Sequence, residues 1–247
     1  MRSIVVPVNF SASSANAARY AADLGMAIGA DIHLVHVSQI PASVSVVPMP
    51  ESVFKELRDS GIEMLAGLQT ELAMRTSGKI AITTDMETGG EETKIEVYCK
   101  EKQPLLVVLG ESGESLQNVL AGSAIVREMR HLPYPILMVP QTAKFRAVRK
   151  IVVACDKEDM DSGIADTLPL LKELSELLGA RLEVLHVVTN GEETAAKVQE
   201  GISDYLEGHG ADWVMVFPKG HSVLEFHRSR SKQIVEHCVV PVLSVHE

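Results

Sequence analysis

One segment of the chain occurs twice in closely similar form, and this repetition restricts the possible folds more than any other feature of the sequence. Gly29–Val37 (GADIHLVHV) has a counterpart 150 residues later in Gly179–Val187 (GARLEVLHV). Two further matches keep the same order, which predicts two copies of one folding unit. These matches pair Ile4–Val6 with Ile151–Val153, and Pro135–Val139 with Pro241–Val245.

The second copy is shorter than the first between its second and last strands. The spacing between matched residues falls there from 150 to 106, a deficit of 44 residues. In the first copy, the apolar pattern predicts a helix at about 51–76, a strand near 80–85 and a helix at about 91–101. The second copy has room for one helix, at about 192–207, before a strand at Trp213–Val216. We therefore expect the second copy to lack one strand and one helix.

Alternating strands and helices predict an α/β fold in which helices cover both faces of a parallel sheet. Aromatic residues make up only 4% of the chain, so the core must consist mainly of aliphatic side chains, as is usual for strands buried under helices. We expect two tandem, doubly wound domains at 1–140 and 150–247, joined by a linker at 141–149. The first helix should bury a stripe formed by Ala17, Tyr20, Ala21, Leu24 and Ile28, with Ser11 or Ser13 as its cap.

Composition and charge argue against several classes of protein. The net charge is −10 and no dense run of Lys and Arg is present, so we expect no binding to nucleic acid. No apolar stretch reaches the roughly 18 residues of a membrane span, and we expect a cytoplasmic protein. The three cysteines and the nine histidines do not have the spacing of a disulfide framework or a zinc site, so we predict no metal site.

Two segments should meet at the carboxyl edge of the first sheet, where doubly wound folds bind ligands. One is Pro7–Ser11, which follows the first strand. The other begins at Gly110 and has the pattern Gly-x2-Gly-x8-Gly-Ser, which ends at Gly122 and Ser123. Glycines allow close approach of a ligand, and the N–H groups at a helix start attract an anion. The pattern is not a Walker A motif, because no Gly-Lys-Ser/Thr follows.

Taken in order along the chain, these segments resemble the universal stress protein family, and the two copies resemble its tandem form. The resemblance implies a Rossmann-like fold of the adenine-nucleotide alpha hydrolase type, and two copies that pack through their last strands. It also implies that the glycine loop holds the phosphates of ATP, carried with Mg²⁺, while the first loop and second strand hold the adenosine. The residues assigned to the site in this way are Pro7, Asn9, Ser11, His36, Val37, Gly110, Gly113, Gly122 and Ser123. For His36, a structural role at the strand end is the alternative to a contact with adenosine.

The sequence departs from the family pattern at three points. Asn9 stands where nucleotide-binding members have Asp, and the glycine spacer has 8 residues in place of 9. Glu111 and Glu114 place two negative charges in the phosphate loop. A carboxylate a few ångströms from a phosphate repels it by about 1 kcal/mol in water, and by more where water is excluded. In the second copy, Arg228 and Ser229 take the places of Gly122 and Ser123, which is typical of a scaffold without a nucleotide site.

Three functions are compatible with this reading. The first is a regulatory or stress-response protein that binds ATP or a related adenine nucleotide in its N-terminal copy. The second is a protein-interaction module of the same fold that binds no nucleotide, which Glu111 and Glu114 favour. The third is an enzyme acting on a nucleotide-activated substrate; it would need an SGGxDS or HxGH loop, and neither is present. We predict no catalytic residues, and a homodimer if the shortened copy leaves an apolar face open.

Overall fold

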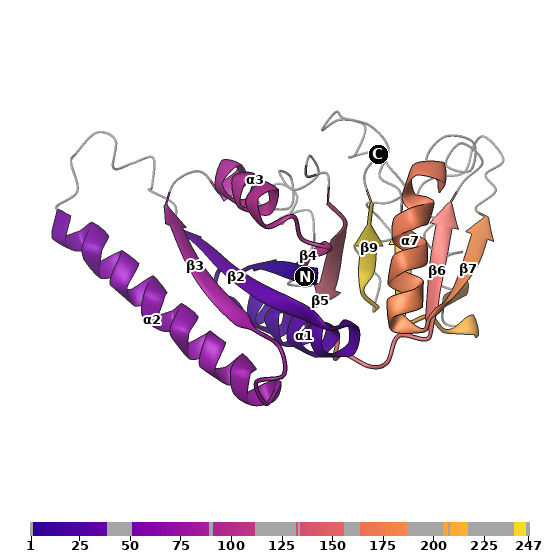
Figure 1. Ribbon diagram of the computed structural model, residues 1–247, viewed down its shortest axis with the longest axis horizontal. Helices are drawn as coiled ribbons and strands as arrows, with labels where there is room; N and C mark the ends of the chain where they lie inside the picture. The colour runs from indigo at the N-terminus through magenta and orange to yellow at the C-terminus, as the bar shows by residue number, and fades with distance from the viewer. Residues whose placement is uncertain are drawn as a thin grey trace.

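The computed structural model describes residues 2–38, 51–88, 91–111, 132, 134–155, 164–186, 205–206, 208–216 and 240–245. Within these residues, nine strands form one sheet in the order β3-β2-β1-β4-β5-β9-β8-β6-β7 (Figure 1). All neighbouring strands are parallel except β5 and β9, which are antiparallel. The predicted α/β class is confirmed.

The elements follow the predicted alternation of strands and helices. The N-terminal half, residues 2–140, contains β1 (Arg2–Pro7), α1 (Ala12–Ile28), β2 (Ala30–Ser38), α2 (Glu51–Arg75), β3 (Ile82–Thr88), α3 (Glu91–Lys102), β4 (Leu106–Glu111) and β5 (Ile136–Pro140). The C-terminal half, residues 150–245, contains β6 (Lys150–Cys155), α7 (Ile164–Leu178), β7 (Arg181–His186), β8 (Trp213–Val216) and β9 (Val242–Ser244). Most of the helix expected at 192–207 lies outside the described residues.

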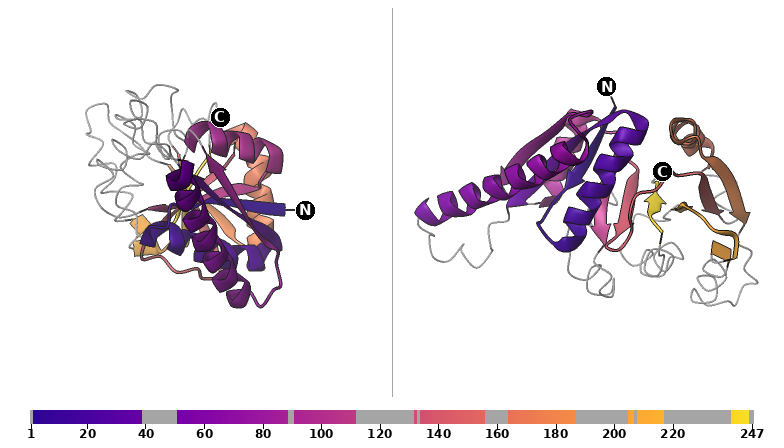
Figure 2. Two further views of the ribbon diagram at one scale, coloured as in Figure 1. Left: turned by 90° about the vertical axis from the view of Figure 1, so that its left-hand side faces the viewer. Right: turned by 90° about the horizontal axis from the view of Figure 1, so that it is seen from below.

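Both faces of the N-terminal sheet are buried. Ile4 and Val6 of β1 belong to a core cluster with the residues of α1, whereas Val5 between them belongs to a second cluster with Ile95 of α3. Successive residues of a strand point to opposite faces, so this alternation shows that helices cover both. Figure 2 shows α1 and α2 side by side on one face, and α3 lies on the other (Figure 1). The predicted stripe on α1 is buried along its whole length.

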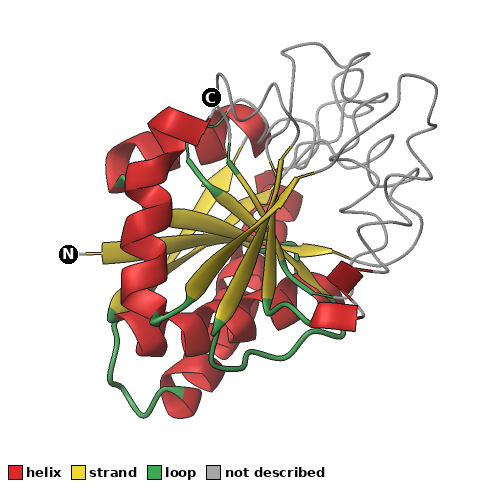
Figure 3. Ribbon diagram, turned by 90° about the vertical axis from the view of Figure 1, so that its right-hand side faces the viewer, coloured by secondary structure: helices red, strands yellow, loops and turns green. Residues whose placement is uncertain are grey.

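The last strands of the two halves pair with each other. In this antiparallel pair, Leu137 of β5 lies opposite Leu243 of β9, and both are fully buried. The pairing joins the strands of both halves into a single twisted sheet, around which the helices are packed (Figure 3). Neither β5 nor β9 is therefore left as an open edge.

The segment 141–149 packs against the N-terminal half. The Asn16 side-chain amide on α1 donates to the carbonyl oxygens of Pro140 and Ala143, at 3.0 and 2.9 Å. The ring of Phe145 meets the ring of Tyr20 edge-on, with centroids 5.2 Å apart. The Trp213 indole N–H, in β8, donates to the Tyr20 hydroxyl at 2.7 Å, and both side chains are buried. The connection between the halves is thus anchored to the core through Ala143, Phe145 and the buried Val148, while most of its other side chains are exposed.

The strand order of the two halves is related by a reversal about the β5–β9 pair. The strands β2-β1-β4-β5, taken toward the middle of the sheet, correspond to β7-β6-β8-β9, taken toward the middle from the other end. Strand β3, which lies outside β2, has no counterpart among the described strands. In the N-terminal half, Ile32 and Leu34 of β2 are 0% exposed on the face that α1 and α2 cover. The matching residues of β7, Leu182 and Val184, are 39% and 58% exposed. No described helix buries this face of β7.

Among the helices that the structure describes, none combines the length and the apolar character that a membrane crossing requires.

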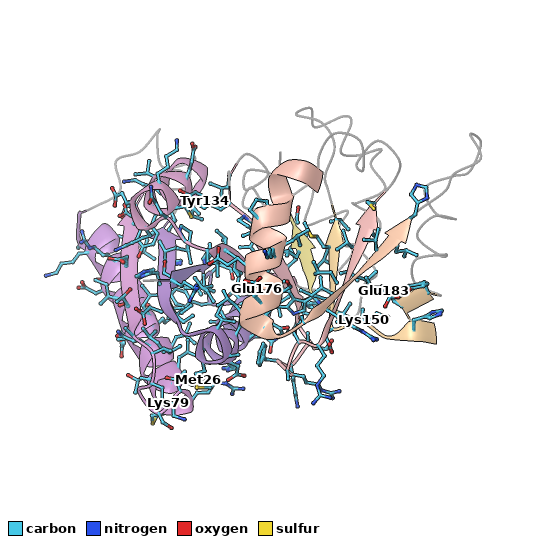
Figure 4. All side chains as sticks on the ribbon, turned by 45° about the vertical axis from the view of Figure 1, so that its right-hand side comes forward. Met26, Lys79, Tyr134, Lys150, Glu176 and Glu183 are labelled. Atoms are coloured by element: carbon cyan, nitrogen blue, oxygen red, sulfur yellow. The ribbon has the colours of Figure 1, made fainter. Side chains whose placement is uncertain are left out.

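The contact between α1 and segment 141–149 can be tested with Asn16→Ala. The substitution leaves the carbonyls of Pro140 and Ala143 without their side-chain donor. We expect the free energy of unfolding to fall by about 1–2 kcal/mol. Urea denaturation followed by the fluorescence of Trp213 measures it. Met26→Ala, at a more exposed position near the end of the same helix (Figure 4), is the control and should cost about 0.5 kcal/mol or less. Equal stability of the two variants would contradict the role given to Asn16.

Candidate functional site

The strand order of the N-terminal half reverses at β1. Strand β1 pairs with β2 on one side and with β4 on the other, so the connections that leave β1 and β4 run in opposite directions. In a doubly wound sheet, such a point leaves a crevice at the carboxyl ends of the two strands. The carboxyl ends here are Pro7 and the pair Gly110–Glu111.

The loop after β1 is held by its own side chains. The Asn9 side-chain oxygen accepts the N–H of Ser11 at 3.1 Å, which closes an Asx turn. The Ser11 hydroxyl accepts the N–H of Ser14 at 3.2 Å and caps α1, so of the two predicted caps Ser11 is the one observed. The buried Pro7 ends the strand. Asn9 is exposed, and its amide N–H groups remain available beside the crevice.

Phe10 adopts a left-handed backbone conformation, with φ 61°. For a bulky residue this conformation costs roughly 1–2 kcal/mol of free energy. Its ring packs on that of His36, with centroids 4.5 Å apart, which offsets part of the cost. No sequence pattern points to a special role for Phe10, because residue type alone does not indicate a positive φ at a non-glycine position.

His36 has a structural partner. Its Nδ1 lies 2.7 Å from the carbonyl oxygen of Val8. A carbonyl can only accept, so Nδ1 carries the proton, and Nε2 of the neutral ring is left as an acceptor. The predicted structural role at the strand end is therefore present, and a contact between Nε2 and a ligand stays a prediction. The Val37 side chain is buried in the core cluster that contains Ile95, so it packs in the interior beside the carboxyl end of β2.

Gly110 is required by packing. A Cβ at this position would lie 2.2 Å from the carbonyl oxygen of Ser13 and 2.7 Å from the nitrogen of Ser14. No real Cβ approaches backbone atoms so closely, so glycine is what lets the first turn of α1 rest on the end of β4. Through this contact, the structure brings Gly110 together with the loop Pro7–Ser11.

The remaining predicted site residues, Gly113, Gly122 and Ser123, lie outside the described residues, as do Glu114 and the loop of the second copy that contains Arg228 and Ser229. Glu111 is described in its backbone only, as the last residue of β4. In the part of the chain that the structure describes, no group of three His, Cys, Asp or Glu side chains has the geometry of a metal site.

The family model of the universal stress proteins matches residues 1–140, more than half of the chain. The chain belongs to the universal stress protein family. A curated relative, universal stress protein MJ0531 of Methanocaldococcus jannaschii, is 25% identical over 146 residues, which make up 58% of this chain and 84% of the relative.

Two solved structures share the fold over almost the whole chain. A universal stress protein from Archaeoglobus fulgidus has a TM-score of 0.73 at 18% identity, covering 99% of this chain and 96% of that one. The functionally unknown protein PA1789 from Pseudomonas aeruginosa has a TM-score of 0.55 at 14% identity, covering 100% and 92%. The fold shared with these two structures therefore extends over both halves of this chain.

The packing role of Gly110 can be tested with Gly110→Ala. The added methyl group would overlap backbone atoms, which cannot move aside as a side chain can. We expect the substitution to destabilise the protein by about 3 kcal/mol or more, or to prevent folding. Gly67→Ala in α2 is the matched control, because nothing lies within 4 Å of its Cβ, and it should stabilise by about 0.5–1 kcal/mol. Thermal and urea unfolding of both variants would decide, and a Gly110→Ala protein as stable as the wild type would refute the close contact.

Proposed function

We propose that this universal stress protein is a regulatory protein that binds ATP, or a related adenine nucleotide, in its N-terminal half. The observation that carries the proposal is the contact between Gly110 and the first turn of α1. This contact places the start of the glycine loop beside the loop Pro7–Ser11, at the point where strand order reverses. Sheets of this kind bind nucleotides at that point.

The residues divide into two sets in this proposal. Asn9 and His36, whose Nδ2 and Nε2 atoms have no partner among the described residues, serve the base and ribose. Gly113, Gly122 and Ser123 serve the phosphates through backbone N–H groups and the Ser123 hydroxyl. Pro7, Ser11 and Val37 shape the edge without donating to the ligand. Any Mg²⁺ arrives bound to the nucleotide, which supplies its oxygen ligands.

The second candidate function is a protein-interaction module that binds no nucleotide. Two observations favour it: Glu111 is the last residue of β4, and Glu114 follows three residues later. Two carboxylates beside a triphosphate raise the electrostatic cost of binding. In this alternative the carboxyl edge of the sheet is an acidic contact surface.

We also propose that the chain is a tandem of two copies of one unit, at 1–140 and 150–247, in which the β5–β9 pair takes the place of a dimer interface. The reversed strand order of the two halves supports this proposal. The second copy, in which Arg228 and Ser229 replace the glycine and serine of the phosphate loop, then acts as a scaffold for the first.

Calorimetric titration of the nucleotide-free protein with ATP, with and without Mg²⁺, distinguishes the two functions. We expect binding at one site per chain, abolished by Gly122→Arg, whose long side chain would fill the phosphate loop. Gly67→Arg is the control, since it adds the same side chain in open space on α2. Absence of binding in both conditions would favour the interaction module, and binding unaffected by Gly122→Arg would place the nucleotide elsewhere.

We propose that two chains associate through the edge strand β7. Its outer backbone groups have no partner strand in the described sheet, and Leu182 and Val184 are exposed. If two β7 strands pair antiparallel with Leu182 opposite its own copy, Arg181 of each chain faces Glu183 of the other. This charge complementarity favours a second copy of the chain as the partner, in a closed twofold dimer.

Sedimentation velocity over a wide concentration range tests this association. We expect a dimer for the wild type and a monomer for Val184→Lys, because the substitution places a charge in the proposed apolar contact. Leu57→Lys, at an exposed leucine on α2, should leave the dimer intact. A wild-type protein that stays monomeric at every concentration would exclude the dimer.

A further inference from the structure

A cavity of about 450 Å³ lies at the junction of the two halves. Its wall is formed by α1, by the segment that follows β5, and by the residues just ahead of β8 and β9. Its volume falls within the range of known small-molecule sites. The side chains that matter for its chemistry are Tyr20, Thr142, Lys144, Arg146 and Asp212. None of these residues belongs to the proposed nucleotide site.

Tyr20 brings a buried hydrogen-bond donor to this wall. The residue is 4% exposed, and its hydroxyl oxygen accepts the indole N–H of Trp213. An indole can only donate, so the hydroxyl proton of Tyr20 is not used in this bond. No described residue accepts that proton, although a buried donor without an acceptor costs about 1–3 kcal/mol. Burial raises the pKa of Tyr20, so the hydroxyl keeps its proton at neutral pH.

The charges in the wall favour an anion. Lys144 and Arg146 form no ion pair with any residue in the described part of the chain. Asp212 is the acidic residue of the wall, and its Oδ2 already accepts the backbone N–H groups of Arg149 and Lys150, at 2.7 and 3.0 Å. The wall therefore contains two cationic side chains and one carboxylate, and that carboxylate already accepts hydrogen bonds from two backbone N–H groups. The wall has a positive charge in an otherwise acidic protein.

We infer that this cavity binds a small molecule through an oxyanion group, phosphate or carboxylate, that accepts the Tyr20 O–H and pairs with Lys144 and Arg146. Thr142 offers a further hydroxyl at the same wall. An oxyanion satisfies the unused donor and the two cations together, which a neutral ligand does not. Since the wall draws on both halves, the bound anion stabilises their junction.

The single tryptophan of the chain reports on this site, because Trp213 is bonded to Tyr20. The full-length protein is titrated with inorganic phosphate in one arm and with succinate in another, at constant ionic strength. Trp213 fluorescence and the unfolding temperature are followed in both. We expect a saturable response with a rise in unfolding temperature in at least one arm, and the arm that responds identifies the oxyanion.

Variants assign the response to the cavity. The double variant Lys144→Gln, Arg146→Gln alters exposed side chains, so it should fold normally and bind about tenfold more weakly or worse. Tyr20→Phe keeps the ring and removes the donor, and calorimetry should show weaker binding independently of any direct change in Trp213 emission. The control Lys55→Gln, Lys79→Gln removes two exposed lysines of the N-terminal half and should bind like the wild type (Figure 4 labels Lys79).

Two outcomes would overturn the inference. One is a response that does not saturate or is absent in both arms, which would mean that water alone occupies the cavity. The other is a saturable response that the Lys144, Arg146 double variant leaves unchanged. Gly122→Arg separates this site from the proposed nucleotide site, since it should abolish ATP binding and leave the response to phosphate or succinate intact.

Discussion

The antiparallel pairing of β5 with β9 is the interaction on which the rest of the structure depends. Each strand alone would leave an edge of unpaired backbone groups, whereas in the pair Leu137 lies opposite Leu243 and both are fully buried. Their pairing joins nine strands in one sheet, and it places Trp213 of β8 against Tyr20 of α1. The junction cavity and the packed segment 141–149 both follow from this placement.

The two halves differ in their described elements: two helices, α2 and α3, and one strand, β3, of the N-terminal half have no described counterpart in the other. In the N-terminal half, α2 completes the cover over β2 and β3 pairs along its outer side. In the C-terminal half, β7 is an edge strand with two exposed aliphatic residues. Its opposite face carries a polar cluster, in which the nearly buried Lys150 pairs with Glu183 at 2.8 Å and Tyr205 donates to the same carboxylate (Figure 4). The ammonium of Lys150 holds the pKa of Glu183 below its usual range, so the Glu183 carboxylate stays ionised at neutral pH.

The carboxyl edge of the N-terminal sheet shows how one residue can have two explanations. Gly110 was assigned to a phosphate loop, yet the packing of α1 on β4 requires a glycine there with or without a ligand. His36 likewise orients its ring through the Val8 carbonyl before any ligand is considered. A functional reading of these positions therefore rests on their placement together at the reversal of strand order, and on the family to which the chain belongs.

The sequence by itself determined the fold class, the order of strands and helices, and the buried stripe of α1. These features depend on local periodicity and on the internal repeat, which can be read without knowing which segments meet. The contact between the two last strands was expected only from the resemblance to the universal stress protein family, and the structure shows it. The sequence also located six of the predicted site residues at one sheet edge: Pro7, Asn9, Ser11, His36, Val37 and Gly110. The tertiary structure alone decided that Gly110 lies against Ser13, that Phe10 takes a left-handed conformation beside His36, and that Tyr20 meets Trp213 at a cavity. Tyr20 and Trp213 are 193 residues apart in sequence, and no local pattern encodes such a contact, because it exists only once both halves have folded onto one sheet.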